Sequence, residues 1–119
     1  MSAVPDPVFV RASEPDTVDH ATVLAVDRDG SIVGRAMLSR LYGLRAEVRI
    51  EIAPSTTITL VLIDALEREA RKRSIIRLEL DEAALSDSTV AALRRWRPLT
   101  DEIRASHPYL TWPTTLVNS

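Results

Sequence analysis

The chain has 119 residues, 45% of them hydrophobic and 27% charged, which is the composition of one soluble domain with a single core. Its net charge is −2 and no basic stripe carries interleaved aromatics, so nucleic-acid binding is disfavoured. The absence of cysteine excludes disulfides and cysteine metal sites. No apolar run approaches the ~20 residues of a membrane span, and no signal peptide is recognisable, so a cytoplasmic protein without membrane contact is the expectation.

The first part of the chain predicts two strands separated by a short polar segment. Residues 1–7 read as a loose leader, and residues 8–119 as a single domain. Val8–Ala12 is a short strand candidate, Ser13–His20 is polar and turn-like, and Ala21–Val26 is a β-branched, apolar strand.

A hairpin and a second turn follow. Asp27–Gly30 is a turn in which Gly30 supplies a positive φ, and Ser31–Gly43 is the returning strand. Gly34 inside that strand predicts a bulge or a close approach of another backbone. Gly43 marks the next turn, so three consecutive strands form an antiparallel meander.

Strict alternation identifies the third strand of the meander, Arg45–Ile52. Its apolar residues are expected on one face and its charged residues on the other, as in a half-buried strand. The apolar set is Ala46, Val48, Ile50 and Ile52, and the charged set is Arg45, Glu47, Arg49 and Glu51.

A long helix is expected at about Thr56–Arg73, capped by Ser55 or Thr56. Basic residues gather at its C-terminal end, where the helix dipole favours cations. Its inward stripe comprises Ile58, Leu62, Ala65, Leu66 and Ala70.

The last third alternates between strand and helix patterns. Ile75–Asp81 is a strand with Ile76 expected to face inward with Leu78 and Leu80, and its helical connection predicts parallel pairing with the preceding strand. Ser86–Trp96 is a second helix, capped by Ser86 or Asp87. Asp101–Ser106 is expected to form a helical turn, and Tyr109–Val117, broken by Pro113, to form edge strands.

This order of elements resembles the fold of the GNAT N-acetyltransferases, and four segments carry the resemblance over residues 21–97. They match, in turn, the family's hairpin, its fourth strand, its central helix with the fifth strand, and its second conserved helix: VLAVDRDGSIVGRAML, AEVRIEIAPS, LIDALEREARKRSIIRLEL and SDSTVAALRRW. The closest similarity is to bacterial protein-lysine acetyltransferases. The implied fold is α+β, with a mixed, mostly antiparallel sheet around a central helix, and with the family's first two helices shortened or missing.

The resemblance implies an acetyl-CoA site whose signature this chain has lost. The family holds the cofactor's pyrophosphate on backbone amides within Gln/Arg-x-x-Gly-x-Gly/Ala at the start of the central helix. The positions implied for the cofactor site are Ile50, Ile52, Thr57, Leu60 and Leu62. Because Thr57, Leu60 and Leu62 stand where the signature has a long polar residue and two small ones, the expectation is that no cofactor binds; acetyl-CoA is the cofactor if the domain is active.

Two other departures concern the acceptor and the general acid. Only Ser13–His20 lies where the family has two helices covering the acceptor site, so that side is cut away or completed by another chain. Many members place a Tyr seven residues after the start of the second conserved helix, and counting from Ser86 leads to Leu93, which cannot protonate a thiolate.

Candidate residues for chemistry each have a simpler explanation. Glu47 stands where some relatives carry a general base, yet it also suits cross-strand ion pairing. His20 and His107 have no second ligand in the sequence and form no metal motif. The pair Asp81-Glu82 fits a solvated strand end better than a cation site.

The segment Ile58–Ile63 is apolar nearly all round, although an amphipathic helix needs a stripe only ~100° wide. Leu60 and Ile63 remain after the inward stripe is assigned. They predict either a cofactor groove filled by the chain's own side chains or packing on another subunit.

The hypothesis is therefore a degenerate GNAT-like domain without acetyl-CoA binding or acetyl transfer. It would be a self-associating regulatory or scaffolding module whose partner is a second copy or another protein chain. The alternative is an active N-acetyltransferase acting on a protein lysine or small amine, with an open cleft between the fourth and fifth strands. A third hypothesis is a non-catalytic small-molecule sensor with an apolar pocket beside Leu60 and Leu62.

Overall fold

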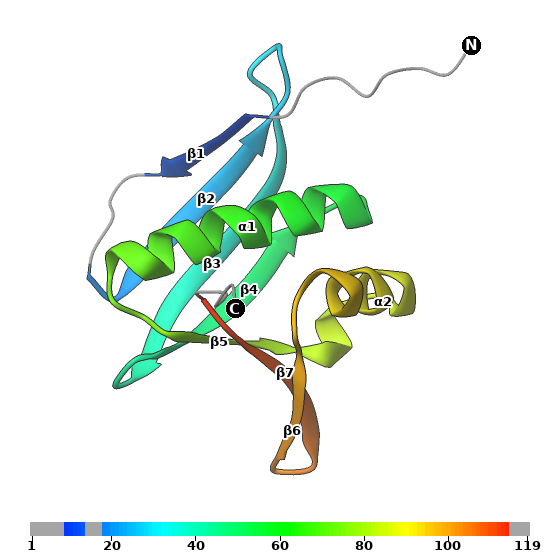
Figure 1. Cartoon of the computed structure of the whole chain (residues 1–119). Coiled ribbons are helices and arrows are strands. Elements are labelled where there is room, and N and C mark those ends of the chain that lie inside the picture. The colour runs from blue at the N-terminus through cyan, green and yellow to red at the C-terminus, as the bar shows by residue number, and fades with distance from the viewer. Residues whose placement is uncertain (1–8, 14–17, 115–119) are drawn as a thin grey trace.

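A computed structural model describes residues 9–13 and 18–114, which form one seven-stranded mixed sheet with the helix α1 across one face and the helix α2 beside α1 (Figure 1). The elements in chain order are β1 (Phe9–Ser13), β2 (His20–Val26), β3 (Ile32–Tyr42), β4 (Arg45–Ile52), α1 (Thr56–Lys72), β5 (Arg77–Asp81), the 3₁₀ turn η1 (Glu82–Ala84), α2 (Asp87–Trp96), β6 (Thr100–Arg104) and β7 (His107–Pro113). The leader, residues 1–7, lies outside the described residues.

The sheet has the strand order β1-β2-β3-β4-β5-β7-β6. The β2–β3–β4 meander is antiparallel, and β4 and β5 are parallel, as the helical connection through α1 predicted. Only residues 14–19 separate β1 from β2, which leaves no room for two long helices between these strands.

The helix α1 lies across one face of the sheet and buries the expected stripe. Its five stripe residues are at most 8% exposed, and they meet the inward residues of the meander, chiefly Ala21, Val23, Ala36, Leu38, Ala46 and Val48. The predicted caps are confirmed. Ser55 Oγ accepts the Ile58 N–H, and Ser86 Oγ accepts the Thr89 N–H, both at 3.2 Å.

Gly34 is a point of close approach between β3 and α1, as its position in the strand predicted. A Cβ atom built on Gly34 would lie 2.7 Å from Ile58 Cγ2 and 3.1 Å from Leu62 Cδ1. Glycine at this position therefore lets the first turns of α1 pack directly on the backbone of β3. Gly30 and Gly43 have φ values of 83° and 55°, as their turns require.

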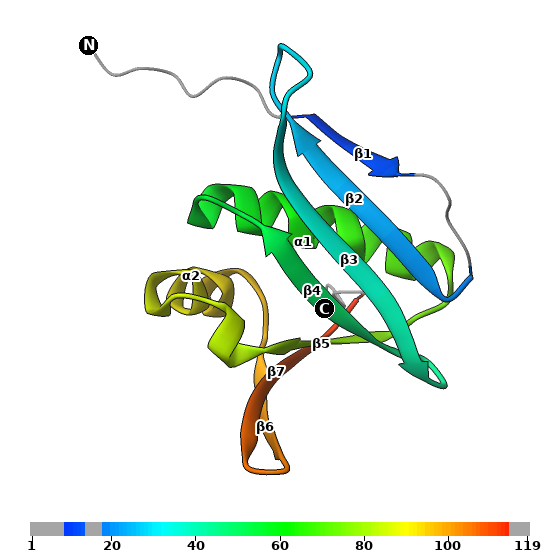
Figure 2. The ribbon, with the colours of Figure 1, turned by 180° about the vertical axis from the view of Figure 1, so that it is seen from behind.

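The opposite face of the sheet carries no helix among the described residues (Figure 2). Its β4 side chains are charged and form the Arg35–Glu51 ion pair at 3.1 Å and the Arg49–Glu47 pair at 3.5 Å, while β2 and β3 add the apolar side chains of Leu24 and Met37 to this face. This face is therefore a mixed surface of ion pairs and apolar side chains.

The C-terminal part differs from the sequence prediction. The segment expected to form a helical turn, Asp101–Ser106, is strand β6 with a tight turn in which Ala105 and Ser106 have φ of 52° and 65°. This pair of positive φ values is the signature of a hairpin turn, usually built with Asn-Gly. Because Ala-Ser is an uncommon way to build it, the sequence favoured the wrong element.

The strand expected at Tyr109–Val117 is not at an edge of the sheet. It is β7, which lies between β5 and β6. Pro113, which has no N–H to donate to a neighbouring strand, is the last residue of β7. Residues 115–117 of the predicted strand lie outside the described residues.

Three apolar side chains are placed differently from the prediction. Ile63 is fully buried in the core of this chain, whereas Ile52 and Ile76 are 48% and 57% exposed. Ile76 precedes β5 rather than lying in it. The register between β3 and β4 shifts by one residue where Arg35 pairs with Ile52, and such an irregularity ends the alternation.

Candidate functional site

The strands β4 and β5 separate at the centre of the sheet. Their pairing runs from Arg45 with Arg77 to Val48 with Leu80, while β4 continues to Ile52 without a β5 partner in that register. The gap faces η1 and the N-terminal turns of both helices. A parallel pair that splays in this way opens a cleft within the sheet, as the alternative hypothesis of an active enzyme required.

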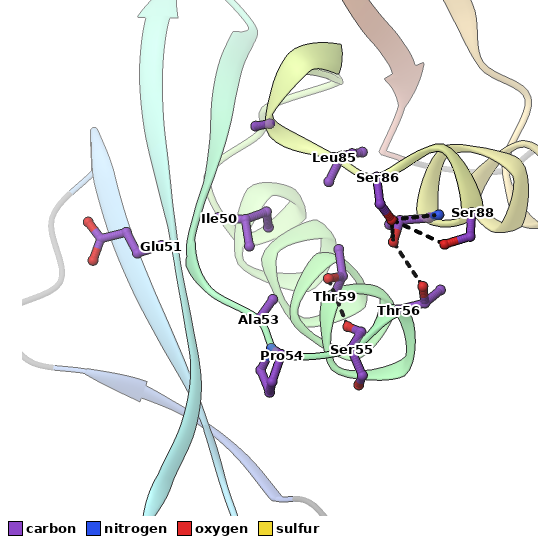
Figure 3. A pocket seen from close by; sticks show the side chains of 12 residues that line it. Ile50, Glu51, Ala53, Pro54, Ser55, Thr56, Thr59, Leu85, Ser86 and Ser88 are labelled. Carbon is purple, nitrogen blue, oxygen red and sulfur yellow. Dashed lines mark hydrogen bonds between the residues drawn. The ribbon is translucent and has the colours of Figure 1, made fainter.

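A cavity of about 470 Å³ lies at this opening (Figure 3). One wall comes from β4 and the β4–α1 connection, and the other from η1 and the start of α2. Its lining combines apolar groups, hydroxyls and one carboxylate, namely Ile50, Ala53, Pro54, Ala84 and Leu85, then Ser55, Thr56, Thr59, Ser86, Ser88 and Thr89, and Glu51.

The hydroxyls form a hydrogen-bonded chain that ties the two helix N-termini together (Figure 3). Thr56 Oγ1 lies 2.8 Å from Thr89 Oγ1, which lies 2.8 Å from Ser86 Oγ. Thr89 is 5% exposed, so this link is largely shielded from water. The two helices are thus held at a fixed spacing across the cleft by groups that also line it.

The backbone donors at the start of α1 are partly used within the chain. Ser55 Oγ takes the Ile58 N–H, and Ser55 O takes the Thr59 N–H at 3.0 Å. The connection between β4 and α1 is residues 53–55, and its central residue, Pro54, has no N–H. The N–H groups of Thr56 and Thr57 are left without a partner inside the helix.

The five positions implied for a cofactor site do not converge. Ile50 lines the cavity, whereas Ile52 is exposed at the end of β4. Thr57 and Leu60 line a separate groove between α1 and α2. Leu62 is fully buried against the sheet, so its side chain does not occupy the opening.

Glu47 lies on the polar face of β4, beside the splayed strands. Its side chain is 28% exposed, and its Oε1 atom is 3.5 Å from Arg49 Nη2. It lines a small cavity of about 160 Å³ together with Ile50 and Asp81. The carboxylate therefore stands at the cleft, with an ion pair along its own strand rather than across strands.

Leu93, at the position that the resemblance assigns to a tyrosine, is fully buried in the core. It packs from α2 into the shared apolar cluster. No polar hydrogen is available at that place to protonate a leaving group.

Asp81 and His107 form a pair that the sequence did not suggest. His107 Nε2 lies 2.7 Å from Asp81 Oδ2, and Asp81 Oδ1 also accepts the Ala83 N–H at 2.9 Å. The hydrogen bond from His107 lowers the pKa of Asp81, and the bond from Ala83 acts in the same direction. The pair joins the ends of β5 and β7. No group of three or more His, Asp or Glu side chains with metal-site spacing occurs in residues 9–13 and 18–114.

A network of ion pairs around the buried Glu79 lies next to Glu47, on the same face of the sheet. Glu79 of β5 is 1% exposed; its Oε2 is 3.0 Å from Arg45 Nη2, and its Oε1 is 2.7 Å from Arg104 Nη2. Arg45 also reaches Glu102 at 2.9 Å. Strand alternation placed Glu79 on a polar face, but its burial depends on β6, which the sequence did not predict.

The sequence comparisons find no match. No family model matches the chain, and no curated protein resembles it in sequence closely enough to be a relative. In the part of the chain that the structure describes, no helix has the length and apolar character needed to cross a bilayer.

Solved structures, in contrast, share the fold. A Klebsiella pneumoniae protein assigned as an acyl-CoA N-acyltransferase superposes with a TM-score of 0.71 and 13% identity, covering 91% of this chain and 98% of the other. Nourseothricin acetyltransferase gives 0.67 and 20% identity over 91% of this chain and 85% of its own. The PaiA N-acetyltransferase of Thermoplasma acidophilum, solved with coenzyme A, superposes with a TM-score of 0.63 and 17% identity, covering 80% of this chain and 61% of the other. The chain therefore has the fold of the GNAT acetyltransferases.

Proposed function

We propose that this chain is a GNAT-like domain that neither binds acetyl-CoA nor transfers acetyl groups, and that it serves as a self-associating regulatory or scaffolding module. The observation that carries the proposal is the short connection from β4 to α1, residues 53–55. Its last residue, Ser55, caps α1 by accepting the Ile58 N–H, so this N–H is already used within the chain. The cysteine-free sequence suits a cytoplasmic setting.

A pyrophosphate needs several converging donors, and this helix start offers few. An α-helix begins with four N–H groups that lack an intrahelical partner, counted from the cap. Of these, the Ile58 N–H is taken by Ser55 Oγ, which leaves those of Thr56 and Thr57, and Pro54 before the cap has no N–H to add. The Thr56 hydroxyl is held by Thr89. The donor set therefore fits a diphosphate poorly, and no lysine or arginine lines the cavity to add charge.

Two further features support the loss of chemistry. Leu93 is buried in the core where an acid would be required. The face opposite α1 has no helix among the described residues to enclose an acceptor. A reaction that must exclude water would lack its cover on that side.

Calorimetric titration of the purified chain with acetyl-CoA tests the proposal. We expect no heat of binding at ligand concentrations up to about 1 mM, a limit that corresponds to roughly −4 kcal/mol. Micromolar affinity, together with acetyl transfer that disappears in Glu47→Gln, would overturn it. Circular dichroism of the same sample shows that a silent titration comes from folded protein.

The active-enzyme alternative has one observation in its favour. The β4–β5 splay and its 470 Å³ cavity provide room for an extended ligand, and Glu47 stands beside them. This alternative predicts that acetyl-CoA raises the thermal unfolding temperature. The sensor alternative is supported only by the groove at Leu60, since Leu62 is not part of its lining.

A further inference from the structure

A groove between α1 and α2, called the interhelix groove, shares no lining residue with the cavity at the β4–β5 opening. It has a volume of about 570 Å³. Its α1 residues recur at helical spacing, so they form one stripe of the helix, outside the stripe that is buried on the sheet. The lining comprises Thr57, Leu60, Val61, Asp64 and Arg68 of α1, and Ala92, Arg95 and Trp96 of α2.

The floor of the interhelix groove is apolar and incompletely covered by the chain. Leu60, Val61 and Trp96 are each half-buried. The Arg97 guanidinium covers one face of the Trp96 ring, with its carbon 3.6 Å from the ring centroid. Apolar surface that is rimmed by charges marks a place where apolar side chains of a partner dock.

The rim of the groove carries an excess of positive charge. Arg68 and Arg95 both line the groove, and Asp64 is the one acid in its lining. Asp64 is paired with Arg68 and lies 3.8 Å from Arg97, so its charge is already used. Arg95 is exposed and makes no ion pair or hydrogen bond to any residue that the structure describes. A guanidinium without a counter-charge therefore lies beside the apolar floor.

The two helices that form the groove run in the same direction. Thr56 at the start of α1 is hydrogen-bonded to Thr89 in the first turn of α2. Farther along α1, Glu67 accepts hydrogen bonds from Arg97, the residue that follows α2. The negative ends of both helix dipoles therefore point toward the arginine end of the groove, where the positive N-terminal end of an antiparallel third helix would be stabilised.

We infer that the interhelix groove binds an acidic amphipathic helix of another protein. The inference rests on the scaffolding part of the proposed function and names the partner for it. Apolar side chains of the bound helix, spaced at i, i+3 or i+4 and i+7, lie on Leu60, Val61 and Trp96. Carboxylates on the flank of the bound helix accept hydrogen bonds from Arg95 and Arg68.

The shape and charge of the groove favour this partner over others. The α1 stripe from Thr57 to Arg68 is about 16 Å long at 1.5 Å per residue, which matches three turns of a helix. A neutral or basic helix would cover Arg95 without giving it a counter-charge, and burying an unpaired charge is costly. The groove of a second copy brings no free acid, because its Asp64 is already paired.

The test uses a synthetic peptide of about 14 residues, with leucines at helical spacing and glutamates along both flanks. The peptide is stapled on its far face, because free helices of this length are marginal in water. Trp96 lines the groove and Trp112 is fully buried, so a change in tryptophan emission reports binding at the groove. We expect micromolar binding of this glutamate peptide. We expect none of two matched peptides, one with lysine replacing glutamate and one scrambled to remove the leucine stripe.

Variants of the chain locate the site of binding. Arg95→Glu and Leu60→Ser should each weaken binding of the glutamate peptide at least about tenfold. Arg95→Glu should also gain binding of the lysine peptide. The control is Arg28→Glu, which makes the same charge change at an exposed site in the β2–β3 turn and should alter the dissociation constant less than about twofold. Circular dichroism shows that each variant is folded.

Each other outcome counts against the inference. It is overturned if the glutamate peptide does not bind, or if the lysine or scrambled peptide binds equally well. Binding that withstands both Arg95→Glu and Leu60→Ser would place the peptide elsewhere on the chain. Dodecanoate that binds alone and displaces the peptide would assign the groove to a small amphiphile instead of a helix.

The proposed function is tested separately on the chain alone. A monomer in sedimentation velocity would overturn its self-association, and binding of acetyl-CoA would overturn its loss of the cofactor. Neither result changes the peptide titration, so a failure of the proposed function and a failure of the docking site are distinguishable.

Discussion

The buried carboxylate of Glu67 offers the sharpest test of how this fold is held together. Glu67 is 1% exposed in the middle of α1. Its two oxygens accept Arg97 Nε at 2.8 Å, Arg97 Nη2 at 2.7 Å and Trp112 Nε1 at 2.8 Å. These contacts join α1 to the end of α2 and to β7. We expect Glu67→Gln to destabilise the domain severely.

The expected loss in the free energy of unfolding follows from the chemistry of the substitution, because glutamine has nearly the same shape as glutamate but no charge. The amide has one acceptor oxygen for three donors, so at least one buried donor loses its partner. The Arg97 side chain, only 11% exposed, also loses its nearer counter-charge and keeps only Asp64, at 3.8 Å. Breaking a buried pair from one side costs about 3–5 kcal/mol. Because glutamine keeps part of the network, we expect about 3 kcal/mol.

Urea unfolding followed by tryptophan fluorescence measures this loss. The control is Asp101→Asn, which removes the acid from the exposed Arg94 pair and should leave the stability close to that of the wild type. Replacing both partners, as in Glu67→Met with Arg97→Met, should recover at least about 1 kcal/mol relative to Glu67→Gln. A loss below about 1 kcal/mol in Glu67→Gln, or a double variant no more stable than the single one, would refute the reasoning.

Two further predictions concern packing and pH. Gly34→Ala should cost about 1–3 kcal/mol, because the new methyl group overlaps Ile58; in urea unfolding its effect should be less than additive with Ile58→Ala, and full additivity would contradict the close approach. Burial raises the pKa of Glu69, but its bonds to Lys72 and Arg73 outweigh burial and lower it overall. A lowered folded-state pKa gives stability that is present above the unfolded pKa of about 4.3 and lost as pH falls through the folded value. Glu69→Gln should therefore be roughly 1 kcal/mol less stable than wild type at pH 7 and equal to it near pH 2, and equal stability at both pH values would contradict the assignment.

The local elements were predictable because their signals lie within a few neighbouring residues. The alternation in Arg45–Ile52 set the bounds of β4, and hydroxyl residues ahead of apolar runs located the caps Ser55 and Ser86. The glycines of the turns and of β3 indicated where backbone conformation or close packing needs the absence of a side chain. The order of these elements was enough to indicate the fold.

The site required the tertiary structure because its parts meet across long stretches of chain. Thr56 and Thr89 are hydrogen-bonded, as are Glu67 and Trp112. No periodicity shows that a charged or hydroxyl side chain has a partner that far away. Nor could a motif comparison show that Leu62 faces the sheet while Leu60 faces a groove, since both are apolar residues on one helix.

The sequence by itself determined most of the strands and helices and the identity of the apolar stripe of α1, because each of these depends on residue type and short-range spacing. Only the tertiary structure decided that β6 pairs with β7 rather than forming a helical turn, that Ile63 belongs to the core, and that two helix starts close on one cavity. Burial and partners are properties of contacts between elements, and those contacts form only when the sheet assembles.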